Sequence, residues 1–115
     1  MMTDCLFCKM VSGEIQPDVV FEDDDVLAFR DVNPQAPVHV LVIPKTHIAT
    51  TNELTPEHAV LIGKMVLAAR QIAADEGVAE PGYRMVMNCN PEAGQSVYHI
   101  HLHMLGGRPM GWPPG

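Results

Sequence analysis

Short apolar runs separated by polar and proline-containing segments dominate the chain, and this pattern predicts the strands of a sheet. We expect five strands, at residues 19–21, 26–29, 38–43, 83–88 and 99–105. The acidic stretch at residues 22–25 joins the first two strands, and we interpret it as a solvated hairpin turn rather than a cation site. Pro44 ends the third strand, because proline has no backbone N–H to donate to a ladder.

The sequence also predicts two helices, one long and one short. Thr55 is a favourable N-cap for the long helix, and Pro56 suits its first helical position. Apolar residues recur at helical spacing after it, at Leu61, Met65, Ala68 and Ile72. Gly77 is a natural C-cap for this helix. The short helix is expected to begin at Asp4 as its N-cap and to stop at Gly13.

The order short helix, strands, long helix, strands predicts an α+β fold in which the long helix covers an antiparallel sheet. One domain at residues 1–115 is expected, since domains commonly have about 100–150 residues. Residues 106–115 hold four glycines and three prolines, so we expect an extended tail.

Composition and charge narrow the class of protein. Hydrophobic residues make up 47% of the chain, which suits a packed core. The formal net charge of −7 repels phosphate backbones, so no DNA or RNA duplex is expected as a partner. No apolar run approaches the roughly 20 residues of a membrane span, so no membrane partner is expected either. Three cysteines do not make a disulfide framework, and no secretory signal is visible, so we expect a cytoplasmic, reducing setting.

Three histidines at alternate positions are the main candidate for chemistry. His99, His101 and His103 alternate with the apolar residues Ile100, Leu102 and Met104. Successive side chains of a strand point to opposite faces, so the imidazoles are expected to share one face, towards a cleft or solvent. The apolar set is expected to anchor the strand on the core.

Three interpretations of this histidine row are open. It could be an ordinary polar face, a single metal site, or a nucleophilic or acid–base site. His99 and His103 lie about 13 Å apart along a strand, which disfavours one zinc with nitrogens at about 2.0–2.1 Å. Neutral imidazole is a competent nucleophile near neutral pH. The preceding Gly94, Gln95 and Ser96 could hold phosphoryl oxygens, which favours the nucleophilic interpretation.

Residues 94–103 resemble the signature of the histidine-triad family, in which three histidines alternate with apolar residues. The segments at residues 21–24, 28–37, 41–45, 82–88, 106–108 and 112–115 resemble the nucleotide-binding branch of that family. The resemblance covers nearly the whole chain from Leu6. It implies a five-stranded antiparallel sheet with one long and one short helix. Two copies would form a homodimer with a continuous ten-stranded sheet.

The resemblance also implies a reaction. The expected enzyme is a purine nucleoside phosphoramidase that cleaves AMP–N or acyl–AMP bonds through a nucleotidyl-histidine and releases AMP. Its partners would be small purine nucleotide conjugates, and catalysis would need no cofactor. The alternatives are an AMP-binding interaction protein with vestigial hydrolysis and a dinucleoside polyphosphate hydrolase.

Carried over by position, the resemblance makes His101 the nucleophile, which His103 and His99 orient, with Ser96 beside the leaving group. Residues implied on the phosphate side are Asn88, Gly94, Gln95 and the Val97 amide. Asp31 would hold the ribose hydroxyls. The base pocket would be lined by Leu6, Phe7, Met10, Ile15, Phe29 and Val32. Trp112, in the tail, would reach the cleft of the partner subunit.

A possible metal site involves the pair Cys5 and Cys8. Their C-x-x-C spacing is a zinc half-site, and His47 and His99 are plausible completing ligands. Other branches of the family hold a structural zinc with two such cysteines, and all four positions are filled here. The alternative is a reduced thiol pair on a small helix. If zinc binds, His99 is a ligand and takes no part in proton transfer. Other histidines, including His39, are interpreted as structural.

Overall fold

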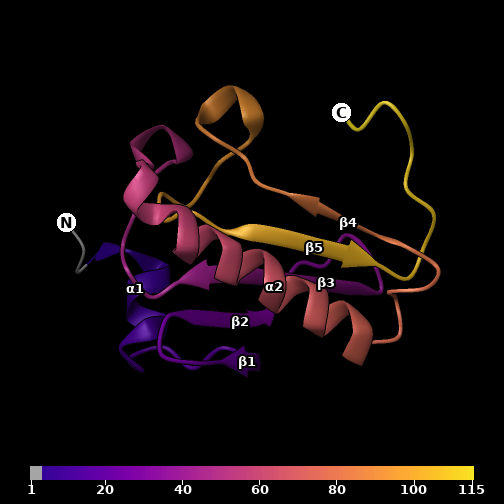
Figure 1. Cartoon of the computed structure of the whole chain (residues 1–115), viewed down its shortest axis with the longest axis horizontal. Coiled ribbons are helices and arrows are strands. Elements are labelled where there is room, and N and C mark those ends of the chain that lie inside the picture. Colours follow the sequence, from indigo (N-terminus) through magenta and orange to yellow (C-terminus); the bar gives the residue numbers. More distant parts are fainter. Residues whose placement is uncertain (1–3) are drawn as a thin grey trace.

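The computed structural model describes residues 4–115 and contains one five-stranded antiparallel sheet and two α-helices (Figure 1). The strand order in the sheet is β1-β2-β3-β5-β4, and all neighbours run antiparallel. The elements are α1 (Leu6–Val11), β1 (Val19–Glu22), β2 (Val26–Arg30), β3 (Val38–Pro44), α2 (Ala59–Asp75), β4 (Tyr83–Val86) and β5 (Leu102–Gly106). The predicted α+β class, five-stranded sheet and helix pair are confirmed.

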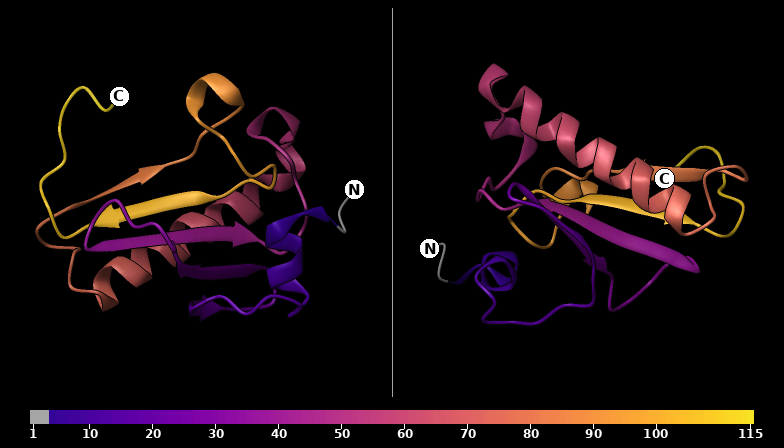
Figure 2. Two further views of the ribbon diagram at one scale, coloured as in Figure 1. Left: turned by 180° about the vertical axis from the view of Figure 1, so that it is seen from behind. Right: turned by 60° about the horizontal axis from the view of Figure 1, so that its bottom comes forward.

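Strands β2 and β3 are buried on both faces, which explains why their sequences are almost wholly apolar. On one face Val40 and Val42 pack with the buried side of α2. On the other face Leu41 and Ile43 pack with Phe7 of α1. Figure 2 shows α2 and α1 on opposite sides of the sheet. The chain therefore has two small cores, and the one under α1 borders the candidate site.

Both helices begin differently from the sequence expectation. The N-cap of α1 is Cys5, whose Sγ accepts a hydrogen bond from the Cys8 N–H at 3.4 Å, so the assignment of Asp4 as the cap was wrong. Thr55 caps a short 3-10 turn, Pro56–His58, and α2 starts only after it. The His58 ring accepts from the Thr55 N–H at 3.0 Å, which completes a capping box and holds the tight turn.

The end of the long helix agrees better with the prediction. The C-cap of α2 is Glu76, and Gly77 follows it with φ of +76°. That left-handed conformation favours glycine and terminates the helix.

The strand that carries the histidines is shorter than predicted. We expected residues 99–105, whereas β5 spans Leu102–Gly106. Leu102 pairs with Val42, so continued pairing would place Ile100 opposite Pro44, which cannot donate. The Ile100 N–H instead bonds the Ile48 carbonyl at 2.8 Å. β4 likewise ends at Val86, opposite His103, rather than at residue 88.

The tail was expected from residue 106, but Gly106 belongs to β5, and residues 107–115 form no helix or strand. Two arginines fix its course: Arg108 Nε donates to the Gln35 carbonyl at 3.0 Å, and Arg84 donates to the Gly111 carbonyl at 2.7 Å. Trp112 is 84% exposed. Within residues 4–115 no helix is both long and apolar enough to cross a membrane.

Candidate active site and metal centre

A cavity of about 480 Å³ lies on the α1 side of the sheet. Its walls are mostly apolar, and its polar lining includes Asp31, Ser96, His101 and His103. The remaining residues predicted for the nucleotide pocket also line it, with the exceptions given below: Leu6, Phe7, Met10, Ile15, Phe29, Val32 and Val97. The fold thus brings segments from both ends of the chain around one nucleotide-sized space.

Within residues 4–115, one of the two ring nitrogens of His101 has a hydrogen-bond partner. Its Nδ1–H donates to the His99 carbonyl at 2.8 Å, and Phe7 packs edge-on against the ring with centroids 5.1 Å apart. Nε2 has no hydrogen-bond partner among residues 4–115, and it is not a buried unpaired atom. His101 is 7% exposed and lines the cavity, so the lone pair of Nε2 is available from the cavity.

His103 lies beside it, with ring centroids 5.0 Å apart. Its Nδ1 is 3.0 Å from His39 Nε2. Burial, together with the neighbouring imidazoles of His101 and His39, lowers the pKa of His103 to about 4. The ring is therefore neutral at physiological pH.

The apolar half of the histidine segment behaves as predicted. Ile100, Leu102 and Met104 are buried in the core on the α2 side of the sheet. The opposite face of this segment carries His101 and His103, which line the cavity.

His99 departs from the predicted outward row, because it is completely buried and does not line the cavity. Its Nε2–H donates to the Pro44 carbonyl at 2.8 Å. Its Nδ1 faces two thiols, at 3.5 Å from Cys5 Sγ and 3.6 Å from Cys8 Sγ. His99 lies before the start of β5, and Phe7 packs edge-on against its ring with centroids 5.9 Å apart.

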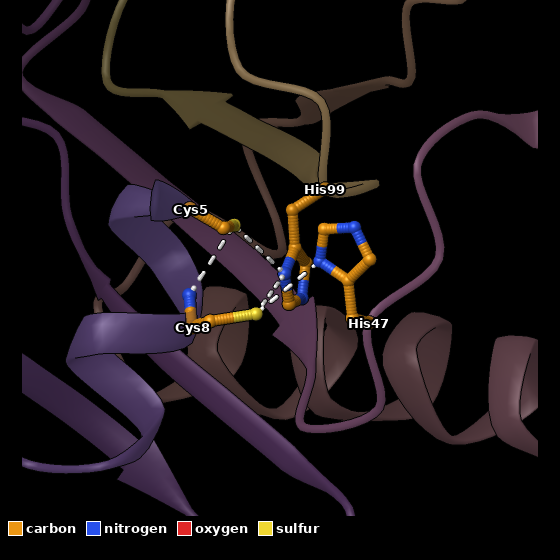
Figure 3. A group of neighbouring side chains, drawn as sticks. All are labelled: Cys5, Cys8, His47 and His99. Atoms are coloured by element: carbon orange, nitrogen blue, oxygen red, sulfur yellow. Dashed lines mark hydrogen bonds between the residues drawn. The ribbon is translucent and has the colours of Figure 1, made fainter. Parts of the chain in front are cut away.

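The four residues predicted for a metal do lie together (Figure 3). The two cysteines come from the start of α1, His47 follows β3, and His99 precedes β5. His47 Nδ1 is 3.2 Å from Cys8 Sγ, and one ligand atom from each residue lies within 4.8 Å of the others. Burial and the neighbouring Cys5 raise the pKa of the Cys8 thiol to about 11, so metal binding here would release a proton. The cluster is a possible Cys/His metal site.

The donor chemistry fits a structural zinc. Two sulfurs and two imidazole nitrogens are the ligand set of closed tetrahedral sites. Because the Nε2–H of His99 is held by Pro44, its Nδ1 lone pair is directed at the thiols. That backbone carbonyl is the kind of outer partner that orients metal-binding histidines.

Three residues predicted on the phosphate side do not line the cavity: Asn88, Gly94 and Gln95. The buried Gln95 amide is instead bonded to the backbone of its own loop and of residue 49. Ser96 and Val97, which follow it, do line the cavity.

His39, which we expect to be structural, is buried in β3, and its Nε2 lies 3.0 Å from His103 Nδ1. His39 lies on β3, opposite Leu105 and diagonal to His103, and its Nε2 is 3.4 Å from Asp31 Oδ2. The sequence shows a histidine within an apolar strand, but only the strand order shows which face of the sheet it occupies and which residue it contacts.

Known proteins share this architecture. A family model described as "Scavenger mRNA decapping enzyme C-term binding" matches residues 4–111. The crystal structure of a HIT family hydrolase from Legionella pneumophila matches with a TM-score of 0.96 and 55% identity, covering 97% of this chain and 100% of that chain. The chain belongs to the histidine-triad family.

Relatives within the histidine-triad family indicate the branch. The purine nucleoside phosphoramidase of Escherichia coli is 50% identical over 111 residues, covering 96% of this chain and 93% of the relative. The 14 kDa zinc-binding protein of Brassica juncea is 49% identical over 114 residues, covering 97% and 100%. The resemblance of the histidine-triad motif and its flanking segments to the nucleotide-binding branch is thereby confirmed.

Proposed function

We propose that this histidine-triad protein hydrolyses purine nucleoside 5′-phosphoramidates, and related acyl-adenylates, to AMP with His101 as nucleophile. One observation carries the proposal: the Nδ1–H of His101 is held by the His99 carbonyl, which leaves the Nε2 lone pair open to a nucleotide-sized cavity. The Escherichia coli relative, named for this activity, supports the substrate class.

The reaction takes two displacements at phosphorus. In the first, Nε2 of His101 attacks the α-phosphorus and a nucleotidyl-histidine forms, while the P–N bond to the amine, which leaves with a proton, or the P–O bond to the carboxylate breaks. In the second, water attacks that phosphorus, the P–N bond to His101 breaks, and AMP leaves. The covalent intermediate divides one difficult displacement into two easier ones.

Neighbouring groups supply protons and charge. In the proposed reaction Ser96, at the cavity wall, and the neutral ring of His103 would donate to the leaving group and to a phosphoryl oxygen. Asp31 Oδ1 already accepts the Asn33 N–H at 2.9 Å, and its carboxylate borders the cavity, where ribose hydroxyls could donate to it. The purine would pack between Phe29 and the apolar residues of α1.

The test follows AMP release from adenosine 5′-phosphoramidates of lysine and tryptamine. His101→Asn is the informative variant, because its amide can still donate to the His99 carbonyl while the nucleophilic nitrogen is gone. We expect wild-type turnover and a loss of about 100-fold or more in the variant, with similar unfolding temperatures. AMP binding without turnover in the wild type would favour an interaction protein, and preferred cleavage of dinucleoside polyphosphates would favour the sister activity.

For the metal, we propose one structural zinc held by Cys5, Cys8, His47 and His99. When bound it would supply no catalytic chemistry but would cross-link α1 to the ends of β3 and β5. The support is the donor set, the oriented His99 ring and the zinc-binding name of the Brassica relative. His99 is then a ligand, and proton transfer falls to the other groups.

Elemental analysis tests the zinc proposal. Protein purified without chelator should contain about one zinc per chain. The double variant Cys5→Ser with Cys8→Ser should contain none and unfold at a lower temperature, whereas the matched control Cys89→Ser should retain the metal. Equal metal content in all three proteins would refute the assignment.

We also propose a homodimer in which the edge strand β4 pairs with its counterpart and extends the sheet to ten strands. Within the sheet β4 has a neighbour on one side only, and exposed Trp112 lies on the tail that Arg84 of β4 anchors. Sedimentation at micromolar concentration should give the mass of two chains. The mass of one chain would contradict the proposal.

A further inference from the structure

The phenyl ring of Phe7 contacts both the Cys/His cluster and the proposed nucleophile. It packs edge-on against the His99 ring, with centroids 5.9 Å apart, and against the His101 ring, with centroids 5.1 Å apart. Phe7 is buried, and it also lines the nucleotide cavity. Because it lies between Cys5 and Cys8 in the sequence, a movement of the two thiols would move this ring as well.

His99 makes a second connection, because its ring and its backbone serve different sites. The ring directs Nδ1 at the thiols of Cys5 and Cys8, at distances of 3.5 and 3.6 Å. The backbone carbonyl of the same residue accepts the Nδ1–H of His101 at 2.8 Å. A change in the orientation of His99 would therefore disturb the hydrogen bond that leaves Nε2 of His101 free for a substrate.

Helix α1 depends on tertiary contacts for its position. It has six residues, too few for a helix that is stable by itself. Cys5 is its N-cap, and Cys8 lies within it, so the Cys/His cluster includes two residues of this element. Leu6, Phe7 and Met10 line the cavity from the same element. The residues that would bind the metal and those that would bind the base thus share one short helix.

The described conformation suits both sites at once. In a tetrahedral zinc centre with Zn–S of about 2.3 Å and Zn–N of about 2.0–2.1 Å, the ligand atoms lie about 3.3–3.8 Å apart. Cys8 Sγ is 3.2 Å from His47 Nδ1 and 3.6 Å from His99 Nδ1, which is close to these separations. The ligands therefore need only small movements to close on a metal, and the cavity is already formed in the same conformation.

We propose that the Cys/His cluster regulates the nucleotide cavity: its two cysteines and His47 are positioning residues that act through Phe7 and His99 on the nucleophile. A ligand that prefers one conformation favours it for a second ligand, and the effect is reciprocal. Loading the cluster with zinc should raise the affinity for AMP about 5- to 50-fold, and AMP should raise the affinity for zinc by the same factor. This regulation rests on the proposed function for the identity of the nucleotide.

The first test is calorimetric titration of AMP into the zinc-loaded and the chelator-treated full chain, with thermal unfolding to show that both are folded. We expect zinc removal to weaken AMP binding about 5- to 50-fold. The double variant Cys5→Ser with Cys8→Ser should bind AMP like the zinc-free wild type, whether or not zinc is added. The matched control Cys89→Ser should behave like the wild type. A purely structural metal would raise the unfolding temperature but leave the AMP affinity of the folded protein unchanged, and that result would overturn the proposal.

Zinc release measures the coupling from the other side. Transfer of zinc from the loaded protein to a chromogenic chelator should slow about fivefold or more in saturating AMP. Phe7→Leu keeps all four ligands but removes the aromatic contact, so AMP should slow the release less in this variant. If the chelator-treated protein does not stay folded, this measurement decides, because it starts from the loaded protein. A release rate that AMP leaves unchanged in the wild type would overturn the proposal.

Ring spectra test the connection to His101 without any nucleotide. Long-range ¹H–¹⁵N correlation spectra of the labelled full chain at pH 7 distinguish Nδ1–H from Nε2–H rings, and His101→Asn assigns the His101 signals. We expect an Nδ1–H ring in the loaded protein and a mixture of tautomers after zinc removal. Unchanged His101 signals would overturn the regulation. Failure of AMP to bind in either state would instead count against the proposed function, and the spectra would still decide the regulation.

Discussion

The buried amide of Gln95 holds the loop that precedes the histidine segment. Its Oε1 accepts the Asn90 N–H at 2.8 Å, and its Nε2–H groups donate to the carbonyls of Ala49 at 2.8 Å and Val97 at 3.1 Å. Gln95 is only 6% exposed, so water does not replace these partners readily. We therefore predict that Gln95→Ala acts mainly on stability and on the placement of Ser96, rather than by removing a phosphate contact.

The magnitude follows from these three hydrogen bonds. Each contributes about 0.5–1.5 kcal/mol net, and a buried partner left unpaired costs about 1–3 kcal/mol. With some access of water to the vacated space, we expect Gln95→Ala to lower the free energy of unfolding by about 2–4 kcal/mol. Gln95→Glu keeps the side-chain volume but directs a carboxylate oxygen at the carbonyls of Ala49 and Val97. At neutral pH this variant should therefore be destabilised at least as much as Gln95→Ala.

Urea unfolding and AMP titration on the same samples measure the two effects. Gln71, an exposed residue of α2 whose amide bonds Asp75 at 2.9 Å, supplies the matched control. Gln71→Ala should change the free energy of unfolding by less than about 0.5 kcal/mol. If Gln95→Ala kept wild-type stability while AMP affinity fell more than about tenfold, the amide would be a phosphate ligand and the reasoning would be refuted.

Three further predictions concern stability measured by urea unfolding. The pKa of His103 is about 4 in the native state against an ordinary 6.5, so as the pH falls the unfolded protein takes up a proton at this ring before the native protein does. The free energy of unfolding should therefore fall as the pH drops from 6.5 towards 4, and this fall should be less steep in His103→Asn. Ile100→Ala empties a fully buried site under α2 and should cost about 2–5 kcal/mol, and a smaller change than 1 kcal/mol would contradict the packing. The Arg30 guanidinium bonds Glu76 through two nitrogens, so Glu76→Gln should cost up to about 1 kcal/mol, and less in 1 M salt; an effect that persists in high salt would contradict an electrostatic origin.

Short apolar runs predicted the sheet and apolar residues at helical spacing predicted the long helix, whereas the short helix was predicted from Asp4 and Gly13 at its ends. The continuous apolar run of β3 is explained by its burial under both helices, and the alternation in residues 99–104 correctly placed Ile100, Leu102 and Met104 on the core. The pairing of Cys5 and Cys8 with His47 and His99 also came from spacing and family resemblance, and the fold brings all four together.

The errors arose from contacts between distant segments and, at the start of α1, from a local cap. Alternation alone put His99 in the same row as His101, but the β3–β5 pairing ends at Val42 and Leu102, and the His99 ring turns to the thiols. Local propensity favoured Asp4 as the cap of α1, where the Cys5 thiol has that position. The contact between His39 and His103 depends on the order of strands, which the sequence around His39 does not specify.

The central claim is that Nε2 of His101 forms a covalent bond to phosphorus, and rapid-quench mass spectrometry tests it most directly. Enzyme mixed with an adenosine 5′-phosphoramidate and quenched within the first turnover should carry one AMP group, located on the peptide that contains His101. The group should be absent from His101→Asn. An AMP group on another residue, or undiminished AMP release by His101→Asn, would contradict the account.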